Sequence, residues 1–230
     1  MIRPNISVSV VIPTLNEAKT ITQTLLQVRK AGACQLIVVD GGSVDGTPEI
    51  ARCSADLVLS SSCGRARQMN EGARVATGEV VLFLHADTVL PRGFPDLLTH
   101  ALADPQVVGG RFDIRLDASG WPFRLVETMM NLRSRLTRIS TGDQAIFVRR
   151  ETFLALGGYP EVELMEDLEL SKKLKRVGGI ACLRERVTTS ARRWRRDGVL
   201  RTIVLMWTLR LGHFLGVPPE RLKTFYADTR

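Results

Sequence analysis

The sequence predicts an α/β fold, a doubly wound and mostly parallel sheet flanked by helices, with a C-terminal lobe added to it. Short runs rich in Val and Ile alternate with helix-like segments through the first half of the chain, as they do in parallel sheets. The 230 residues, 44% hydrophobic and 24% charged, can form one large core. We therefore expect a single domain over residues 1–230, with halves of about 1–116 and 117–230.

The first half contains four predicted strands, at residues 7–12, 36–39, 56–60 and 80–84. The first helix should carry Ile21, Leu25 and Val28 on its buried face, with Asn16 as its N-cap and Gly32 at its end. A short helix should begin at Thr47-Pro48, since proline fits the first helical turn. A third helix is expected at 66–76. Alternation of these elements predicts the parallel sheet.

The second half is less regular. Strands are expected at 107–116 and 145–148, and helices at 121–138, 151–156 and around Leu170 to Val177. Gly109-Gly110 suggests a bulge or a close backbone approach. Residues 199–217 are apolar but include Arg201 and Arg210, which makes them too polar to span a membrane. We expect a buried helix there, or as the second choice a helix lying on an anionic membrane surface.

The net charge of +8 favours anionic partners such as nucleotides or phospholipid headgroups. The four cysteines have no CxxC spacing, and no signal-peptide pattern precedes the first strand. We therefore expect free thiols and a cytoplasmic protein, either unattached or peripheral at the inner face of the membrane. Acids at the predicted strand ends would repel phosphates, so nucleic acid is not an expected partner.

Acidic side chains follow three predicted strands, as Glu17, Asp40 and Asp87. The carboxyl ends of parallel strands meet at one edge, which is where open α/β sheets bind ligands. Asp87 with His85 nearby could hold a divalent cation, Mg²⁺ or Mn²⁺, and the imidazole favours Mn²⁺. Strand-end acids can also be helix caps or turn formers, but Asp40 and Asp87 follow wholly apolar runs, which favours function.

Three further clusters could take part in chemistry. Arg65 lies at a predicted helix N-terminus, which can bind an anion. Glu166 and Asp167 begin another helix, where acids either complement the helix dipole or supply a general base. Trp194 lies within Arg192-Arg193-Trp194-Arg195-Arg196, which could clamp a diphosphate, form a solvated basic loop or form a patch for nucleic acid.

Together these motifs resemble the family 2 glycosyltransferases, which have the GT-A fold. The resemblance runs from about residue 7 to 195 and rests on three ordered segments: Val10-Val11-Ile12-Pro13-Thr14-Leu15-Asn16-Glu17, Val38-Val39-Asp40-Gly41-Gly42-Ser43-Val44-Asp45-Gly46-Thr47 and Leu84-His85-Ala86-Asp87-Thr88. Gly142-Asp143-Gln144, Gly157-Gly158-Tyr159 and Met165-Glu166-Asp167-Leu168 resemble the acceptor-side motifs. The pattern is most similar to a small bacterial subgroup associated with radical-SAM proteins and arsenosugar biosynthesis.

The resemblance implies a metal-dependent, inverting transfer of sugar from a nucleotide-diphosphate sugar to an acceptor hydroxyl. It assigns donor binding to Thr14, Glu17, Asp40, Arg65 and His85. It assigns Mn²⁺ or Mg²⁺ binding to Asp87 and catalysis, as general base, to Asp167. Acceptor or diphosphate contacts would come from Asp143, Gln144, Glu166 and Trp194. The acceptor itself is left open, either lipid-linked or a small molecule.

The chain departs from the family pattern at one position, since His85 replaces the first acid of the DxD motif. A neutral imidazole adds no negative charge, so the site would depend more heavily on Asp87 and the diphosphate. Two other functions remain alternatives: a sugar-phosphate nucleotidyltransferase, and a non-catalytic basic module that binds membranes or nucleic acid. The glycine-free loop Pro13-Thr14-Leu15-Asn16-Glu17 argues against the nucleotidyltransferase.

Overall fold

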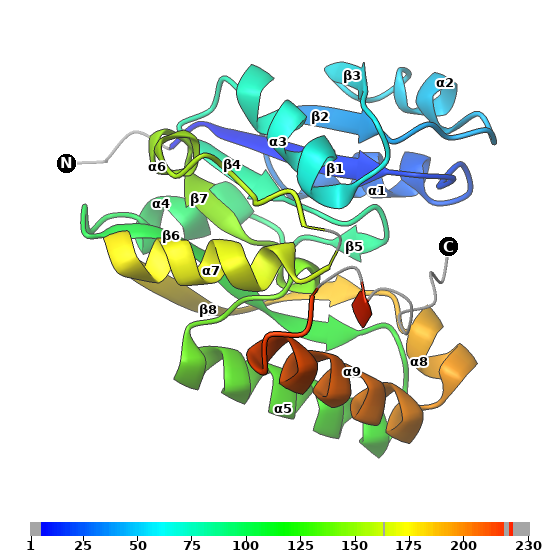
Figure 1. Cartoon of the computed structure of the whole chain (residues 1–230). Coiled ribbons are helices and arrows are strands. Elements are labelled where there is room, and N and C mark those ends of the chain that lie inside the picture. The colour runs from blue at the N-terminus through cyan, green and yellow to red at the C-terminus, as the bar shows by residue number, and fades with distance from the viewer. Residues whose placement is uncertain (1–5, 163, 219–220, 223–230) are drawn as a thin grey trace.

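A computed structural model describes residues 6–162, 164–218 and 221–222. Over these residues the chain forms one eight-stranded sheet, in the order β3-β2-β1-β4-β7-β6-β8-β5, with helices packed against it (Figure 1). The strands are β1 (Val8–Thr14), β2 (Gln35–Asp40), β3 (Leu57–Ser60), β4 (Val80–Phe83), β5 (Thr88–Val89), β6 (Val107–Leu116), β7 (Phe147–Arg149) and β8 (Gly179–Thr189).

The described helices are numbered in chain order, as labelled in Figure 1. They are α1 (Ile21–Ala31), α2 (Thr47–Ala51), α3 (Arg65–Val75), α4 (Phe94–Ala101), α5 (Trp121–Thr137), α6 (Arg150–Ala155), α7 (Glu166–Val177), α8 (Arg192–Asp197) and α9 (Val199–Phe214), with a 3₁₀ turn η1 (Gly142–Gln144). No helix in residues 6–162, 164–218 or 221–222 is long and apolar enough to cross a lipid bilayer.

The sheet is mostly parallel, which confirms the predicted fold class. Strand β1 runs parallel to β2 and β4, β2 runs parallel to β3, and β6 runs parallel to β8. Strand β7 lies antiparallel between β4 and β6, and β5 is antiparallel to β8. Because β1, β2 and β4 are parallel, Thr14, Asp40 and the loop after Phe83 lie at the same edge.

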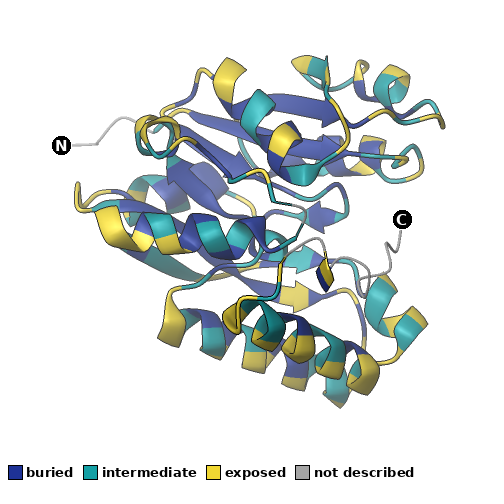
Figure 2. Ribbon diagram, viewed as in Figure 1, coloured by how far each residue is buried: buried dark blue, intermediate teal, exposed yellow. Residues whose placement is uncertain are grey.

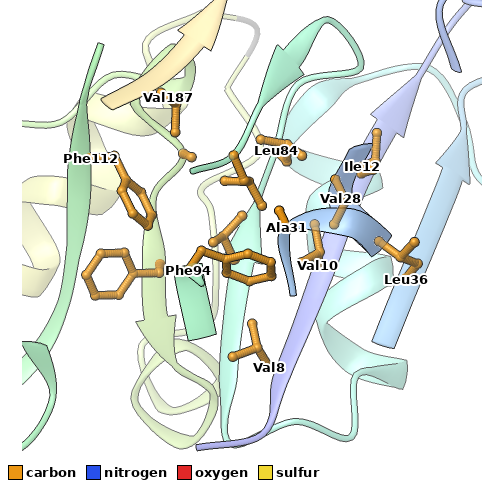
Figure 3. Packing of buried hydrophobic residues seen from close by; sticks show 14 of the residues in the cluster. Val8, Val10, Ile12, Val28, Ala31, Leu36, Leu84, Phe94, Phe112 and Val187 are labelled. Carbon is orange, nitrogen blue, oxygen red and sulfur yellow. The ribbon is translucent and has the colours of Figure 1, made fainter. Parts of the chain in front are cut away.

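Two hydrophobic clusters cover opposite faces of the sheet, as the alternation of side chains along a strand requires. On one face α1 and α4 pack on alternate residues of the central strands, with Val10, Ile12 and Leu36 in the same buried cluster as Phe94. Figure 3 shows this packing. The other face carries α3, α6 and α7. The central strands are therefore buried on both sides, which accounts for their unbroken apolar runs.

The close approach predicted at Gly109-Gly110 is confirmed. A Cβ on Gly109 would lie 2.6 Å from the carbonyl oxygen of Phe147, and one on Gly110 would lie 2.4 Å from that of Ala181. Neither position has room for a side chain, because β6 is paired on both sides there. The register of β6 with β8 also shifts between Val107 and Gly109, which is the bulge that the glycines indicated.

Two local predictions are wrong. Asn16 does not cap α1, whose N-cap is Thr20; Asn16 instead adopts a left-handed φ of 55°, and its Oδ1 accepts a hydrogen bond from the Val44 N–H at 3.0 Å. Most of residues 199–217 do form a helix, α9, which ends at Phe214, but it is not buried. Only Thr202 and Leu209 of α9 are buried, and half of its large apolar residues are exposed (Figure 2).

Candidate active site

The ends of β1 and β2 are locked together by buried polar side chains. The Thr14 hydroxyl donates to Asp40 Oδ1 at 3.1 Å, and the side-chain amide of Gln68, on α3, donates to the carbonyl oxygens of Thr14 and Val39 at 2.8 Å each. Thr14 and Gln68 are almost fully buried, and Asp40 is 3% exposed. Gln68 was not among the predicted site residues, and it supports the edge on which two of them lie.

Asp40 uses its carboxylate to hold the loop that follows β2. Oδ2 accepts hydrogen bonds from the N–H groups of Gly42 (2.9 Å) and Ser43 (2.8 Å), and Oδ1 accepts from the Ser43 hydroxyl as well as from Thr14. Both oxygens are therefore engaged within the chain. Asp40 shapes the loop that borders the sheet edge, so the turn-forming role weighed from sequence is present.

Asp87 lies in a cluster of charges drawn from distant parts of the chain. Burial raises the pKa of its carboxyl group, and the carboxylate of Glu17 raises it further, while Arg192 and Arg65 lower it. Glu17 and Asp87, two of the acids expected to converge at the strand ends, are thus brought together, and Arg65 lies near them. Arg192, at the start of α8, joins them. The sequence suggested a general role for the arginines around Trp194 but did not single out Arg192.

The donor set at Asp87 suits a divalent cation that is shared with a phosphorylated ligand. In the part of the chain that the structure describes, no group of three His, Cys, Asp or Glu side chains is arranged to hold a metal ion alone. Mg²⁺, however, is usually bound by one or two carboxylates together with substrate phosphates. A cation beside Asp87 would also offset the negative charge of Glu17, which raises the pKa of Asp87.

His85 connects this cluster to the second half of the site. Its ring packs against Gly142 in η1, so that a Cβ on Gly142 would lie only 2.7 Å from His85 Nε2. The backbone N–H of Gly142 in turn donates to Asp167 Oδ2 at 2.8 Å. His85, Gly142 and Asp167 therefore form one contiguous path from the loop after β4 to the start of α7.

Asp167 has the surroundings of a carboxylate whose proton affinity is raised. Burial raises its pKa most, and the charge of Asp143 adds to the effect, whereas the hydrogen bonds from Gly142 and Leu168 and the charge of Arg210 lower it. Asp143 also has a buried Oδ1 without a hydrogen-bond partner. Two carboxylates thus lie close enough to influence each other at the position where the sequence predicted a base.

Two arginines balance this carboxylate pair. Burial and the charge of the neighbouring Arg210 lower the pKa of Arg133, on α5, to about 10. The negative charges of Asp143 and Asp167 partly oppose this by raising it. Burial likewise lowers the pKa of Arg210, on α9, and the same two carboxylates partly oppose this by raising it. Nε and Nη2 of Arg133 are buried without a hydrogen-bond partner. The sequence analysis missed both residues, because they lie on helices far along the chain and no local motif marks them.

Glu166 and Tyr159 complete the region around Asp167. Burial raises the pKa of the Tyr159 phenol well above its usual value, and the charges of Asp167 and Glu166 add to this. The Tyr159 ring packs edge-on against Phe83 at the end of β4, with centroids 4.9 Å apart. Met165, just before the two acids, has a left-handed φ of 69°. Backbone strain of this kind is concentrated at functional sites.

The two remaining predicted residues have structural contacts of their own. Gln144 is fully buried; its Oε1 accepts from the Thr141 N–H at 3.1 Å and its amide donates to Ser134 at 3.0 Å, which pins η1 to α5. The Trp194 ring packs with the hydrophobic cluster around Leu116 and Val126. For both residues, contact with a ligand stays a prediction.

Comparison with known proteins identifies the family. A model of the family described as "Glycosyl transferase family 2" matches residues 9–155. The chain belongs to this family. The match covers both the donor-side motifs and the Gly142-Asp143-Gln144 segment, so the resemblance drawn from sequence is confirmed at the level of the family. Membership of the arsenosugar-associated subgroup stays a prediction.

Several curated relatives of this family 2 chain are named as glycosyltransferases. It is 32% identical over 166 residues to a "PGL/p-HBAD biosynthesis glycosyltransferase" of Mycobacterium bovis, a match that covers 66% of this chain and 62% of the relative. It is 31% identical over 148 residues to the "Uncharacterized glycosyltransferase YibD" of Escherichia coli K12, covering 58% of this chain and 41% of the relative. The chain thus spans less than two thirds of the length of these relatives.

Solved structures show the same fold. The family 2 chain matches TarS of S. aureus, residues 1–349, with a TM-score of 0.66 and 19% identity, over 87% of this chain and 64% of that one. It also matches TarS 1–349 in complex with UDP-GlcNAc, with a TM-score of 0.65 and 21% identity, over 80% and 58% of the two chains. At this identity the likeness establishes the GT-A fold alone.

Proposed function

We propose that the chain is a metal-dependent, inverting glycosyltransferase that transfers a sugar from a nucleotide-diphosphate sugar to an acceptor hydroxyl. One observation carries the proposal: two carboxylates with raised pKa values, Asp87 and Asp167, lie at one edge of the sheet and are linked through His85 and Gly142. Membership of glycosyl transferase family 2 supports the reaction class.

The donor would bind at the ends of β1, β2 and β4. The TarS structures with UDP-GlcNAc and with UDP support a nucleotide-sugar donor. Thr14, Glu17, Asp40, Arg65 and His85 stay the proposed donor-binding residues. Asp40 would act through the loop that it holds, since its oxygens are already hydrogen-bonded. The sugar and the nucleotide base are left open.

Asp87 would hold Mn²⁺ or Mg²⁺ together with the donor diphosphate. The bound ion would supply positive charge against the negative charge that develops on the departing nucleotide diphosphate. Arg65 and Arg192 lie close enough to influence Asp87 and would stabilise the same charge. The family 2 match and the paired carboxylates at Asp87 support this arrangement.

Asp167 would act as the general base, accepting the acceptor's proton as its oxygen attacks the anomeric carbon. Its raised pKa supports the role, since a base works best when its pKa approaches the working pH. Attack from the face opposite the leaving group would invert the configuration at that carbon. Asp143, Gln144, Glu166 and Trp194 stay proposed contacts of the acceptor or diphosphate.

The acceptor class stays open between a lipid-linked and a small-molecule hydroxyl. One relative's name refers to PGL/p-HBAD biosynthesis, which does not decide between them for this chain. A cytoplasmic position, at the inner face of a membrane or free of it, likewise stays a prediction.

A thermal-shift panel tests the donor site. Nucleotide-diphosphate sugars are added to the protein with and without Mn²⁺, and one of them should raise the melting temperature more in the presence of the metal. Asp87→Ala should abolish the metal-dependent part of that shift, while Glu49→Ala, an exposed acid on α2, should not. A shift that is the same with and without metal would contradict metal dependence.

Asp167→Asn tests the base. This variant should keep the donor-induced thermal shift and lose transfer, whereas Glu169→Gln, two residues along the same helix, should keep both. Anomeric configuration of the product, read by NMR, tests inversion. Undiminished turnover in Asp167→Asn would overturn the assignment of the base, and release of pyrophosphate from a nucleoside triphosphate would favour nucleotidyl transfer instead.

A further inference from the structure

Helix α5 turns polar side chains towards the sheet, the reverse of an ordinary surface helix. Its buried residues are Val126, Glu127, Asn131 and Ser134. The Asn131 amide bonds both the N–H (2.9 Å) and the carbonyl (3.1 Å) of Ile114, and Glu127 accepts from the Leu116 N–H at 2.6 Å. Because β7 pairs with β6 only at Gly109 and Gly110, these side chains satisfy the backbone of β6 beyond that pairing.

Most of the large apolar residues of α5 consequently face outward. Five of them are each at least 50% exposed: Trp121, Leu125, Met129, Leu132 and Leu136. Their spacing of three or four residues places them in one stripe along the helix. No described part of the chain covers this stripe.

Helix α9 shows the same pattern. Its exposed apolar residues are Leu200, Val204, Trp207, Leu211 and Phe214, each at least 58% exposed and again three or four residues apart. The inner sides of α5 and of the α8–α9 segment share one hydrophobic cluster, through Val126, Trp194 and Ile203. Figure 2 places the exposed sides of both helices at the same end of the molecule.

This concentration of exposed apolar residues is not general to the surface. Of the seventeen large hydrophobic residues that are exposed in the described chain, five lie on α5 and six on α9 or at Leu215, which makes eleven. The other six are spread over the rest of the molecule. Single exposed apolar residues are ordinary, whereas large contiguous patches mark a surface that binds something.

The charge around the stripes is positive. Between residues 119 and 138 and between 192 and 217 the only acids are Glu127 and Asp197. Glu127 is buried, and Asp197 pairs with Arg196 at 2.8 Å. Arg192, Arg195, Arg196 and Arg201 are exposed. An apolar surface with a basic border is complementary to anionic headgroups over hydrocarbon.

The dimensions fit a helix that lies in the membrane surface and does not cross it. Helix α9 has 16 residues, or about 24 Å at 1.5 Å per residue, whereas the hydrocarbon core is about 30 Å thick. Trp and Phe on one side and arginines beside them are typical of interfacial helices. We propose that the outer stripes of α5 and α9 dock on an anionic lipid bilayer, with the exposed Arg195 and Arg201 contacting its headgroups. This goes beyond the transfer reaction.

Vesicle binding tests the docking surface. The protein should sediment with vesicles of phosphatidylcholine and phosphatidylglycerol, bind phosphatidylcholine alone more weakly, and lose binding as salt rises. Its tryptophan emission should shift to the blue on binding, because Trp121 and Trp207 leave water. Both are exposed, at 76% and 61%.

Paired variants separate the two stripes. Trp207→Ser with Phe214→Ser, and separately Leu125→Ser with Met129→Ser, should each lower vesicle affinity by at least about tenfold, without lowering the melting temperature. Arg195→Glu with Arg201→Glu should lower affinity for anionic vesicles by a similar factor. Leu26→Ser with Val44→Ser, which are exposed elsewhere (46% and 91%), should bind like the unchanged protein.

Two results would overturn the proposal. One is that the unchanged protein fails to bind anionic vesicles, or that the stripe and arginine variants bind them as well as the unchanged protein does. The other is a stable homodimer, seen by light scattering, that Trp207→Ser with Phe214→Ser dissociates. In that case the face would be closed by a second copy of the chain.

Discussion

The two carboxylates of the proposed reaction, Asp87 and Asp167, are both desolvated, but they have different neighbours. Asp87 has Glu17, Arg65 and Arg192 around it, which suits a position that shares a cation with a diphosphate. Asp167 instead receives two backbone hydrogen bonds, from Gly142 and Leu168, each at 2.8 Å. These bonds orient the carboxylate without neutralising it, which is what a base requires.

The pH profile of transfer should report the charges around Asp167. Its carboxylate must be ionised to accept a proton, and its pKa is raised, so activity should fall as pH decreases through that raised pKa. Asp143→Asn removes a negative neighbour and should move this acid limb to lower pH. Arg210→Gln removes a positive neighbour and should move it to higher pH. The measurement is kcat/KM against pH.

The titratable groups around Asp167 come from several elements, and any one variant could shift the acid limb of the profile through another of them. The decisive result is therefore that Asp143→Asn and Arg210→Gln shift the limb in opposite directions. The groups concerned are Asp143 on η1, Arg210 on α9, Arg133 on α5, Tyr159 between α6 and α7, and Glu166 at the start of α7. Arg201→Gln, an exposed arginine on the same helix as Arg210, is the control and should leave the profile unchanged. Shifts of the same sign in both variants would show that another group titrates.

Gly142 is the residue on which the two halves of the site meet. Its N–H bonds Asp167, and a Cβ there would push on the His85 ring. Gly142→Ala should therefore lower kcat/KM by roughly 100-fold, the loss typical of a misplacement of about 1 Å, with little change in melting temperature. Gly179→Ala is the matched control, because its Cβ would meet only ordinary contacts of 3.4 Å or more. Equal activity of the two variants would contradict a positioning role for Gly142.

At the scale of elements, α5 stabilises the fold through hydrogen bonds to β6 more than through apolar burial. Asn131→Leu would leave the N–H and carbonyl of Ile114 buried without partners, at a cost of about 2–5 kcal/mol of unfolding free energy. Leu132→Asn, on the exposed side, should cost under about 1 kcal/mol. Urea denaturation measures both. A larger loss at Leu132 than at Asn131 would mean that the outer stripe is part of the folded core.

The elements that the sequence predicted well are those whose environment is uniform along the chain. Strands β1, β2 and β4 are buried on both faces, so their apolar runs are clear. Strand β8 was missed because exposed Arg184, Glu185 and Arg186 interrupt its pattern. The exposure of α9 could not be predicted, because hydrophobic periodicity locates an apolar stripe but does not say whether protein or something else covers it.

The candidate site shows the same division. Residues in contiguous motifs, such as Asp87 and Asp167, could be found from sequence because strand ends and helix starts position them locally. Arg133 and Arg210 could not, since only the packing of α5 and α9 brings them to the carboxylates. The roles of Gln144 and Asp40 within the chain were also invisible, because their partners are backbone groups or residues far along the sequence.

At the scale of the whole molecule, strands from both halves of the chain share one sheet, with β7 between β4 and β6. The single domain predicted for residues 1–230 should therefore unfold in one transition. The three tryptophans, Trp121, Trp194 and Trp207, all lie in the C-terminal half. Their fluorescence reports on that half alone, whereas far-ultraviolet circular dichroism reports on the entire chain. The two thermal transitions should coincide.

The nucleotide-diphosphate sugar that stabilises the protein in the thermal-shift panel makes this test stronger, because the residues proposed to bind its nucleoside, such as Thr14 and Asp40, lie in the N-terminal half. At 100 times its dissociation constant, a ligand of the folded state adds about 2.7 kcal/mol to the unfolding free energy. For a chain of this size that raises the melting temperature by roughly 5–10 °C. If the halves unfold together, tryptophan fluorescence and circular dichroism should report the same rise. A rise in melting temperature that circular dichroism reports and fluorescence does not would mean that the C-terminal half unfolds independently of the donor site.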